Sequence, residues 1–204
     1  MFPLSNWPYI RTIDFSGDIK TDAVSFLTLN DKRKTAEHCI AVANTSEKIA
    51  NRFGLDKSRA AISAYLHDIS AVMKPQDMLD YAVGQGWEID AAERKYPFIL
   101  HQRLSMTFAK ELFGINDAVI LSAIACHATL KCSPLSYDMA LFLSDKLSWD
   151  QEGTPPFYDL VSSALEKSLP HACLTYINYV LQNGMILYPH KWLLEAKSWL
   201  EKFT

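Results

Sequence analysis

Six side chains of this 204-residue chain combine metal-binding chemistry with apolar surroundings. Each falls in a segment whose pattern predicts a helix, on or beside its apolar face. They are His38, His67, Asp68, His101, His127 and Asp145. An aspartate on a buried face is costly unless it is paired or binds a cation. Imidazole nitrogen and carboxylate oxygen suit divalent transition metals, so we expect Fe, Mn, Co, Ni or Zn at these residues.

A single histidine in such a segment is more commonly a satisfied core or surface residue than a ligand. An adjacent His-Asp pair is also common by chance. The order of the residues is more informative than any one of them. His38 comes first, His67 and Asp68 follow a run of small residues, and Asp145 lies in a later apolar segment.

This order resembles the H…HD…D motif of the HD phosphohydrolase superfamily. AAISAYLHDIS is similar to that family's small-residue run before the His-Asp pair. Three further stretches resemble the YqeK-type branch, and the similarity spans about residues 33 to 203. They are ILHQRLSMTFAKELFGINDAVILSAIACHAT, MALFLSDKL and NYVLQNGMILYPHKWLLEAKSWL.

The resemblance implies an HD-type helical bundle and a metal-dependent hydrolase of dinucleoside tetraphosphates, which releases two nucleoside diphosphates. His38, His67, Asp68 and Asp145 would then hold one metal ion. His101 and His127 would hold a second ion, with Asp68 as the bridging carboxylate. The resemblance makes Asp68 and His67 the catalytic pair. Two cations can share the charge of a phosphoanhydride and activate a water molecule.

Three positions depart from the YqeK-type pattern. Ala71 stands where the family carries a lysine, and Lys74 is the nearest replacement. The family's HTTG becomes HATLK, which retains Thr129 and Lys131, and Gln151 replaces an arginine. We expect Lys131, Thr129 and Lys74 to contact substrate phosphates, with Lys146 as a further candidate. The alternative for Lys131 is a solvated surface lysine.

These departures leave other functions open. The same metal site would serve a nucleoside 5′-monophosphate phosphatase or a cyclic-nucleotide phosphodiesterase. A different class is a metal-binding sensor module that has lost catalysis. Retention of all six proposed ligands argues against the sensor.

The elements that must position these residues are helices. Amphipathic spacing and Gly54 predict a helix over 33–53, and Asp56 can cap the next one. Further helices are expected to begin at Pro75, Asp117, Ser136 and Pro170, and another to begin after Pro155 and Pro156. Two more are expected over about 98–113 and about 190–203. We expect an all-α single domain with about five core helices and peripheral C-terminal helices.

Residues 1–30 have no periodic pattern and are expected to form an N-terminal arm or extension to a hydrolase domain over 31–204. A net charge of −3 and the lack of a basic tract disfavour a dedicated nucleic-acid binder, so the expected partner is a small nucleotide. Four cysteines without a C-x-x-C pair, no signal-peptide pattern and no long apolar run predict a soluble cytoplasmic protein away from membranes. A homodimer is left open.

Overall fold

The computed structural model describes residues 6–149 and 152–203, and over these ranges the chain is helical with no β-strand. This confirms the predicted all-α class. The helices are α1 (Ile19–Leu29), α2 (Arg33–Arg52), α3 (Lys57–Leu66), α4 (Pro75–Gly84), α5 (Ala91–Lys95), α6 (His101–Glu111), α7 (Ala118–Cys126), α8 (Ser136–Leu147), α9 (Tyr158–Leu165), α10 (Leu169–Gln182) and α11 (Lys191–Leu200). Short 3-10 turns cover Ile69–Val72 and Pro97–Leu100.

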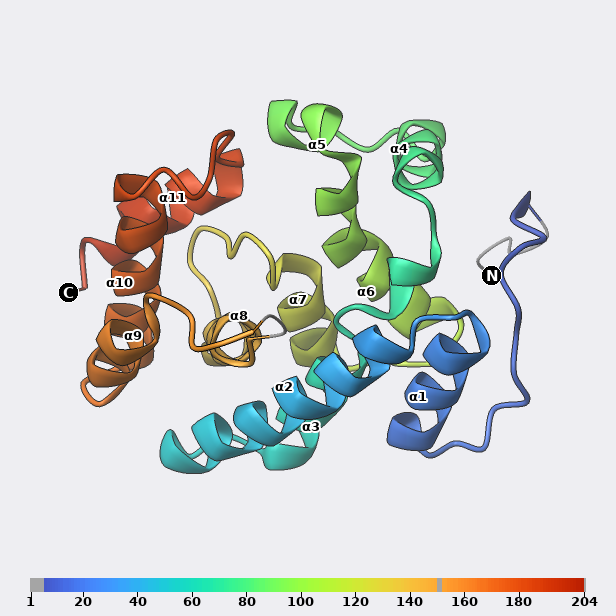
Figure 1. Cartoon of the computed structure of the whole chain (residues 1–204), viewed down its shortest axis with the longest axis horizontal. Coiled ribbons are helices and arrows are strands. Elements are labelled where there is room, and N and C mark those ends of the chain that lie inside the picture. The colour runs from blue at the N-terminus through green and yellow to red at the C-terminus, as the bar shows by residue number, and fades with distance from the viewer. Residues whose placement is uncertain (1–5, 150–151, 204) are drawn as a thin grey trace.

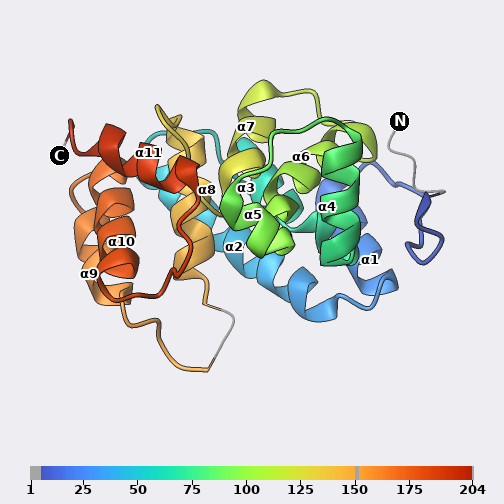
Figure 2. The same cartoon turned by 90° about the horizontal axis from the view of Figure 1, so that it is seen from above.

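The helices form two groups along the long axis of the molecule (Figures 1 and 2). Helices α1 to α4, α6 and α7 contribute side chains to one apolar core, which contains Phe26, Leu66 and Phe108. Helices α9 to α11 pack on α8 around a second core, with Phe142 and Phe157 at its centre. Helix α8 lies between the groups and contributes side chains to both cores, so it connects them.

Several helix ends agree with the capping signals in the sequence. The Asp56 side chain accepts a hydrogen bond from the Arg59 backbone N–H at the start of α3, and Asp117 caps α7 in the same way. Pro75 occupies the first position of α4, where its missing N–H costs no helical hydrogen bond. None of the helices in the described ranges is long and apolar enough to cross a membrane.

The expectation that residues 1–30 are irregular is wrong for Ile19–Leu29, which form α1. The signals are present but weak: Asp18 caps the helix, and Ala23, Phe26 and Leu27 form its buried stripe. Phe26 and Leu27 are fully buried in the first core. This segment is therefore integrated into the fold, while the division into an arm and a domain stays a prediction.

The sequence pattern indicated that every proposed ligand lies inside a helix, and the structure differs from this expectation at three helix ends. His67 and His127 are the C-terminal cap residues of α3 and α7, and Asp68 follows in the turn before the 3-10 segment. His101 is the first residue of α6, since the expected helix from residue 98 begins as a 3-10 turn. Helix ends therefore bring three imidazoles and a carboxylate to one point.

Candidate metal centre

The six predicted ligands converge on one point between α2, α3, α6, α7 and α8. The His38 Nε2 lies 3.0 Å from the Asp145 Oδ1, and the His67 Nε2 lies 3.6 Å from the same oxygen. On the other side, the Asp68 Oδ1 lies 3.2 Å from the His101 Nε2 and 3.4 Å from the His127 Nε2. Asp68 and the His67 Nε2 are 3.7 Å apart, so the two halves are contiguous.

Three of the histidines are oriented by the same local device. The Nδ1 atoms of His67, His101 and His127 each lie 2.6–2.8 Å from the carbonyl oxygen three residues earlier. A carbonyl accepts and cannot donate, so each ring donates from Nδ1 and turns its Nε2 toward the centre, where that atom carries a bare lone pair in the neutral imidazole. Backbone carbonyls at the helix ends supply these contacts, which is why the helix termini matter here.

Bare nitrogens facing one another favour a cation between them. The Nε2 atoms of His101 and His127 are 2.9 Å apart. Ligand atoms bound to one ion at ~2.0–2.1 Å lie about 3 Å from each other. The His67 Nε2 and the Asp68 Oδ1 are also buried and have no hydrogen-bond partner. Imidazole lone pairs and a carboxylate oxygen that are buried without a hydrogen-bond partner match the requirements of a divalent metal.

Two overlapping groups of side chains could each hold an ion. One comprises His38, His67 and Asp145, and the other comprises His67, Asp68 and His127, with all donor atoms of a group within 4.8 Å of one another. The donor set therefore fits the predicted metal site. The individual ligand assignments stay predictions.

The charge states of the centre suit metal binding. Burial raises the pKa of a carboxyl, but nearby charges outweigh it at both aspartates. The His67 imidazole holds the pKa of Asp68 well below its ordinary value, and the Lys146 ammonium does the same for Asp145. Burial lowers the pKa of His127 to about 4. The Asp68 charge and its neighbours raise the pKa of His67 although burial opposes this. A bound cation would replace the proton that the carboxylates hold on His67.

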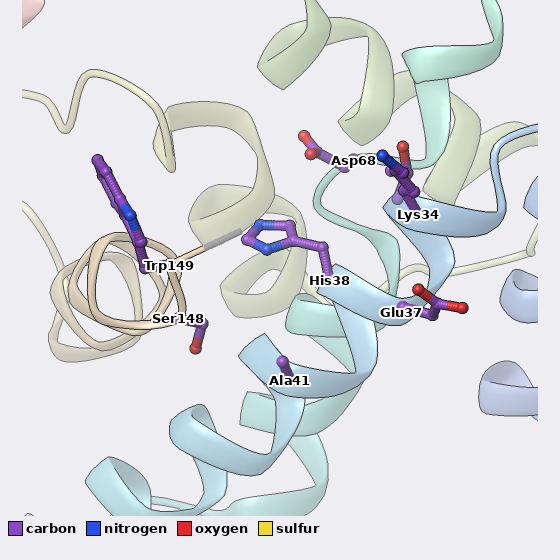
Figure 3. A pocket seen from close by; sticks show the side chains of 8 residues that line it. Lys34, Glu37, His38, Ala41, Asp68, Ser148 and Trp149 are labelled. Atoms are coloured by element: carbon purple, nitrogen blue, oxygen red, sulfur yellow. The ribbon is translucent and has the colours of Figure 1, made fainter. Parts of the chain in front are cut away.

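A two-lobed cleft opens on the centre. We call the cavity of about 420 Å³ between α2 and the end of α8 the outer lobe, lined by residues that include Lys34, His38 and Trp149 (Figure 3). The cavity of about 280 Å³ is the inner lobe, which reaches Asp68, Asp145 and Lys146. His38, Asp68, Ser148 and Trp149 line both lobes, so the proposed metal position lies where they meet.

Aromatic side chains form much of the inner lobe: Phe98, Trp149, Phe157 and Tyr176. Phe98 stacks on the His101 ring at a centroid distance of 4.5 Å. Trp149 and Phe157 follow Asp145 in the sequence and both line the lobe, whereas the neighbouring Tyr158 does not. The sequence reasoning did not find Phe98 or Tyr176, since nothing in their spacing distinguishes them from core residues.

The three residues predicted to bind substrate do not line either lobe. The Lys131 Nζ lies 3.1 Å from the Asp138 carboxylate and donates to the Ser122 hydroxyl, so it neutralises a buried acid. The Thr129 hydroxyl is buried and bonds to Gln102. These contacts give both residues structural tasks in place of the expected phosphate contacts.

Lys74 lies elsewhere, with its ammonium 4.7 Å from the centre of the Tyr9 ring. Gln151, which replaces the arginine of the family, lies outside the described residues. The cations that do line the cleft are Lys34 and Lys146. Lys34 precedes His38 by four residues, and this helical spacing is the sequence signal that identifies it.

An all-helical bundle around a cluster of four histidines and two aspartates is the arrangement of a metal-dependent hydrolase of the HD class. The HD domain family model matches residues 35–150, more than half of the chain. The chain therefore belongs to the HD domain family, and it is an HD-domain hydrolase.

The chain is 41% identical over 155 residues to an uncharacterized protein in the pepC 5′ region of Lactococcus lactis subsp. cremoris, covering 76% of this chain and 78% of that protein. It is 20% identical over 165 residues to a symmetrical bis(5′-nucleosyl)-tetraphosphatase of Bacillus subtilis, covering 80% and 87%. A crystal structure of a predicted HD superfamily hydrolase involved in NAD metabolism from Clostridium acetobutylicum superposes with a TM-score of 0.80 at 22% identity, over 93% of this chain and 99% of that one. This likeness shows that the two folds are the same.

Proposed function

We propose that this HD-domain hydrolase cleaves a phosphoanhydride bond of a dinucleoside tetraphosphate at a divalent metal centre. The observation that carries the proposal is the set of bare Nε2 atoms around two buried carboxylates. His67, His101 and His127 are fixed by backbone carbonyls, and Asp68 faces all three. Such preorganisation holds ligands and substrate in a reactive geometry without movement at the time of reaction.

The residues divide into two tasks. His38, His67, Asp68, His101, His127 and Asp145 would hold one or two ions, which when bound supply charge neutralisation and an activated water. Asp68 is the best placed to serve both ions, because it lies between His67 on one side and the His101–His127 pair on the other.

Lys146 has a distinct task in the inner lobe. Its Nζ lies 2.5 Å from the Asp145 Oδ2, while the Oδ1 of the same carboxylate faces His38 and His67. The ammonium therefore orients Asp145 toward the proposed ions. It also offers a positive charge to a phosphate in the lobe.

The dinucleotide substrate is supported by the shape of the cleft and by the relatives. Two lobes meet at the centre, and aromatic rings in the inner lobe offer stacking surfaces for a base. The Bacillus subtilis relative is a symmetrical bis(5′-nucleosyl)-tetraphosphatase. A substrate with a nucleoside at each end of its phosphate chain fits a cleft that extends on both sides of the reacting position.

The test is hydrolysis by purified protein supplied with Mn²⁺, Fe²⁺ or Co²⁺. The panel contains diadenosine tetraphosphate, adenosine 5′-monophosphate and a cyclic nucleotide. The proposal expects metal-dependent release of ADP alone from the tetraphosphate, and chelation should abolish it. Preferential turnover of the monophosphate or the cyclic nucleotide, or no turnover with any metal, would contradict the proposal.

A matched pair of variants connects the activity to the centre. Asp68→Asn keeps the size of the side chain and removes its charge, and we expect activity to fall by ~10³-fold or more while helicity is retained. Asp80→Asn changes an exposed carboxylate on α4 and should leave the rate unchanged. Substantial activity in Asp68→Asn would remove Asp68 from the mechanism.

A further inference from the structure

The two lobes of the cleft differ in how their positive charge is held. In the inner lobe, Lys146 is paired with Asp145 and partly buried. In the outer lobe, Lys34 is exposed, and its ammonium has no hydrogen bond or ion pair within the described residues. A lysine held by a ligand carboxylate has a fixed position, whereas an unpaired lysine beside a cavity is available to an anion.

Helix α2 directs Lys34 into the outer lobe. Lys34, His38 and Ala41 follow one another at intervals of four and three residues, so they share one face of the helix, and all three line the lobe. Glu37 also lines the lobe, but its carboxylate points away from His38 in Figure 3. The same helix face therefore presents a proposed metal ligand and an unpaired cation.

The opposite wall of the outer lobe comes from the end of α8. Ser148 and Trp149 line it, and in Figure 3 the Trp149 indole stands across the gap from His38. The lobe thus has a positive charge on one wall and an aromatic plane on the other. A phosphate linked to a nucleoside combines the two matching groups, an anion and a base that can stack.

We propose that Lys34 binds a phosphate of a polyphosphate substrate in the outer lobe, on the side of the metal centre away from Lys146. The inference rests on the proposed hydrolysis of a dinucleoside tetraphosphate and adds to it a residue that binds the phosphate chain. A polyphosphate chain can reach both lysines across the position of cleavage. A nucleoside monophosphate has a single phosphate and can occupy the reacting position without Lys34.

Lys34→Met tests the inference because it retains the apolar stem and removes the charge. Charge-assisted hydrogen bonds contribute about 1.5–3 kcal/mol, so we expect the KM for diadenosine tetraphosphate to rise by roughly tenfold or more. The KM for adenosine 5′-monophosphate, where it is a substrate at all, should stay within about twofold. Lys34→Arg, which restores the charge, should recover most of the affinity.

Lys48→Met is the matched control, since Lys48 lies on the same helix and lines a separate cavity. It should leave both KM values unchanged. An unchanged tetraphosphate KM in Lys34→Met would overturn the inference, and so would an equal loss for both substrates. Wild-type protein that cleaves only the monophosphate would also overturn it.

A binding measurement separates this inference from the proposed function. Inorganic tripolyphosphate is titrated calorimetrically into wild-type, Lys34→Met and Lys48→Met proteins loaded with the same metal. We expect about tenfold weaker binding for Lys34→Met alone. If no nucleotide is hydrolysed, the proposed function fails while this result still supports an anion subsite at Lys34. Equal binding by the three proteins would refute the subsite even if hydrolysis is found.

Discussion

At the scale of single residues, the clustering of six histidine and aspartate side chains could be predicted from the sequence because their order resembles the HD motif. The structure brings all six of these residues together. The tautomers could not be predicted in this way. They depend on carbonyl oxygens of Ala64, Phe98 and Ile124, which become available only at the observed helix ends.

The phosphate contacts were harder to predict, for a related reason. The sequence indicates Lys131 and Thr129 because both are retained where HATLK replaces the HTTG of the family. Their side chains instead satisfy Asp138 and Gln102, which are buried polar groups that need partners. Lys131 lies beyond the end of α7, so its spacing of four residues from His127 does not place the two on one helix face, whereas Lys34 and His38 share a face of α2.

His127→Ala distinguishes a two-ion centre from a one-ion centre. His127 pairs with His101 on the side of Asp68 that faces away from Asp145. Its removal should lower the metal content from about two ions to about one per chain and strongly reduce the rate. Elemental analysis of the variant and of wild-type protein purified in parallel gives the answer. Equal metal content in the two proteins would leave a single-ion site.

At the scale of elements, α1 shows where pattern reasoning was insufficient. Its apolar stripe is short, and the aromatic and proline residues before it obscure its start. Packing determines the outcome, since Phe26 contacts Phe108 and Phe113 edge-on in the first core. Tertiary burial thus stabilises a helix that local signals indicate only weakly.

Phe26→Ala should therefore destabilise the whole fold. Removing a fully buried phenyl ring costs about 3–5 kcal/mol in unfolding free energy. Leu29→Ala, on the same helix but partly exposed, is the control and should cost much less. Urea unfolding followed by circular dichroism measures both. A similar, small effect of the two substitutions would mean that α1 is a dispensable arm.

Helix α5 was missed by the sequence reasoning, and it carries a buried acid that connects three helices. Glu93 accepts a hydrogen bond from the Asp90 backbone N–H in a capping box. Its other oxygen lies 3.5 Å from Arg103 on α6 and 3.5 Å from His190, the N-terminal cap of α11. His190 is buried, and its side chain caps α11 by accepting a hydrogen bond from the Trp192 backbone N–H.

The pH dependence of stability should reveal this connection. Burial raises the pKa of Glu93, but the nearby His190 imidazole, the hydrogen bond from the Asp90 backbone N–H and the Arg103 charge outweigh it, so the pKa is below the ordinary value of 4.5. The stabilisation is thus fully present above pH 4.5 and is lost as the pH falls through the folded-state pKa. We expect Glu93→Gln to lower the unfolding free energy at pH 7 by about 1–3 kcal/mol and to flatten the acid side of the profile.

The control for Glu93 is Glu195→Gln, at an exposed position on α11. It should change neither the stability at pH 7 nor the slope below pH 4.5. Melting temperatures measured from pH 7 down to pH 3.5 compare the three proteins. An acid profile of Glu93→Gln that parallels the wild-type profile would show that this carboxylate does not connect the helices in solution.

At the scale of the whole molecule, the proposed reaction site lies where the two groups of helices meet. His38, Asp68 and His101 belong to the first group, whereas Phe157 and Tyr176 come from the second, and all of them line the inner lobe. Local patterns in the sequence predicted the class of fold, and the resemblance to the HD motif indicated which histidines and aspartates would lie together. The sequence could not predict the two-lobed cleft, which depends on how α8 to α10 pack against the first group.

The most direct test of the metal centre is an anomalous difference map from crystals of the protein grown with Mn²⁺. A peak is predicted between the His67 Nε2, Asp68 and Asp145, with ligand distances near ~2.0–2.3 Å. A second peak is predicted beside His101 and His127. A well-occupied Mn²⁺ elsewhere with none at these residues, or Asp145 turned away from His67 toward solvent, would contradict the account.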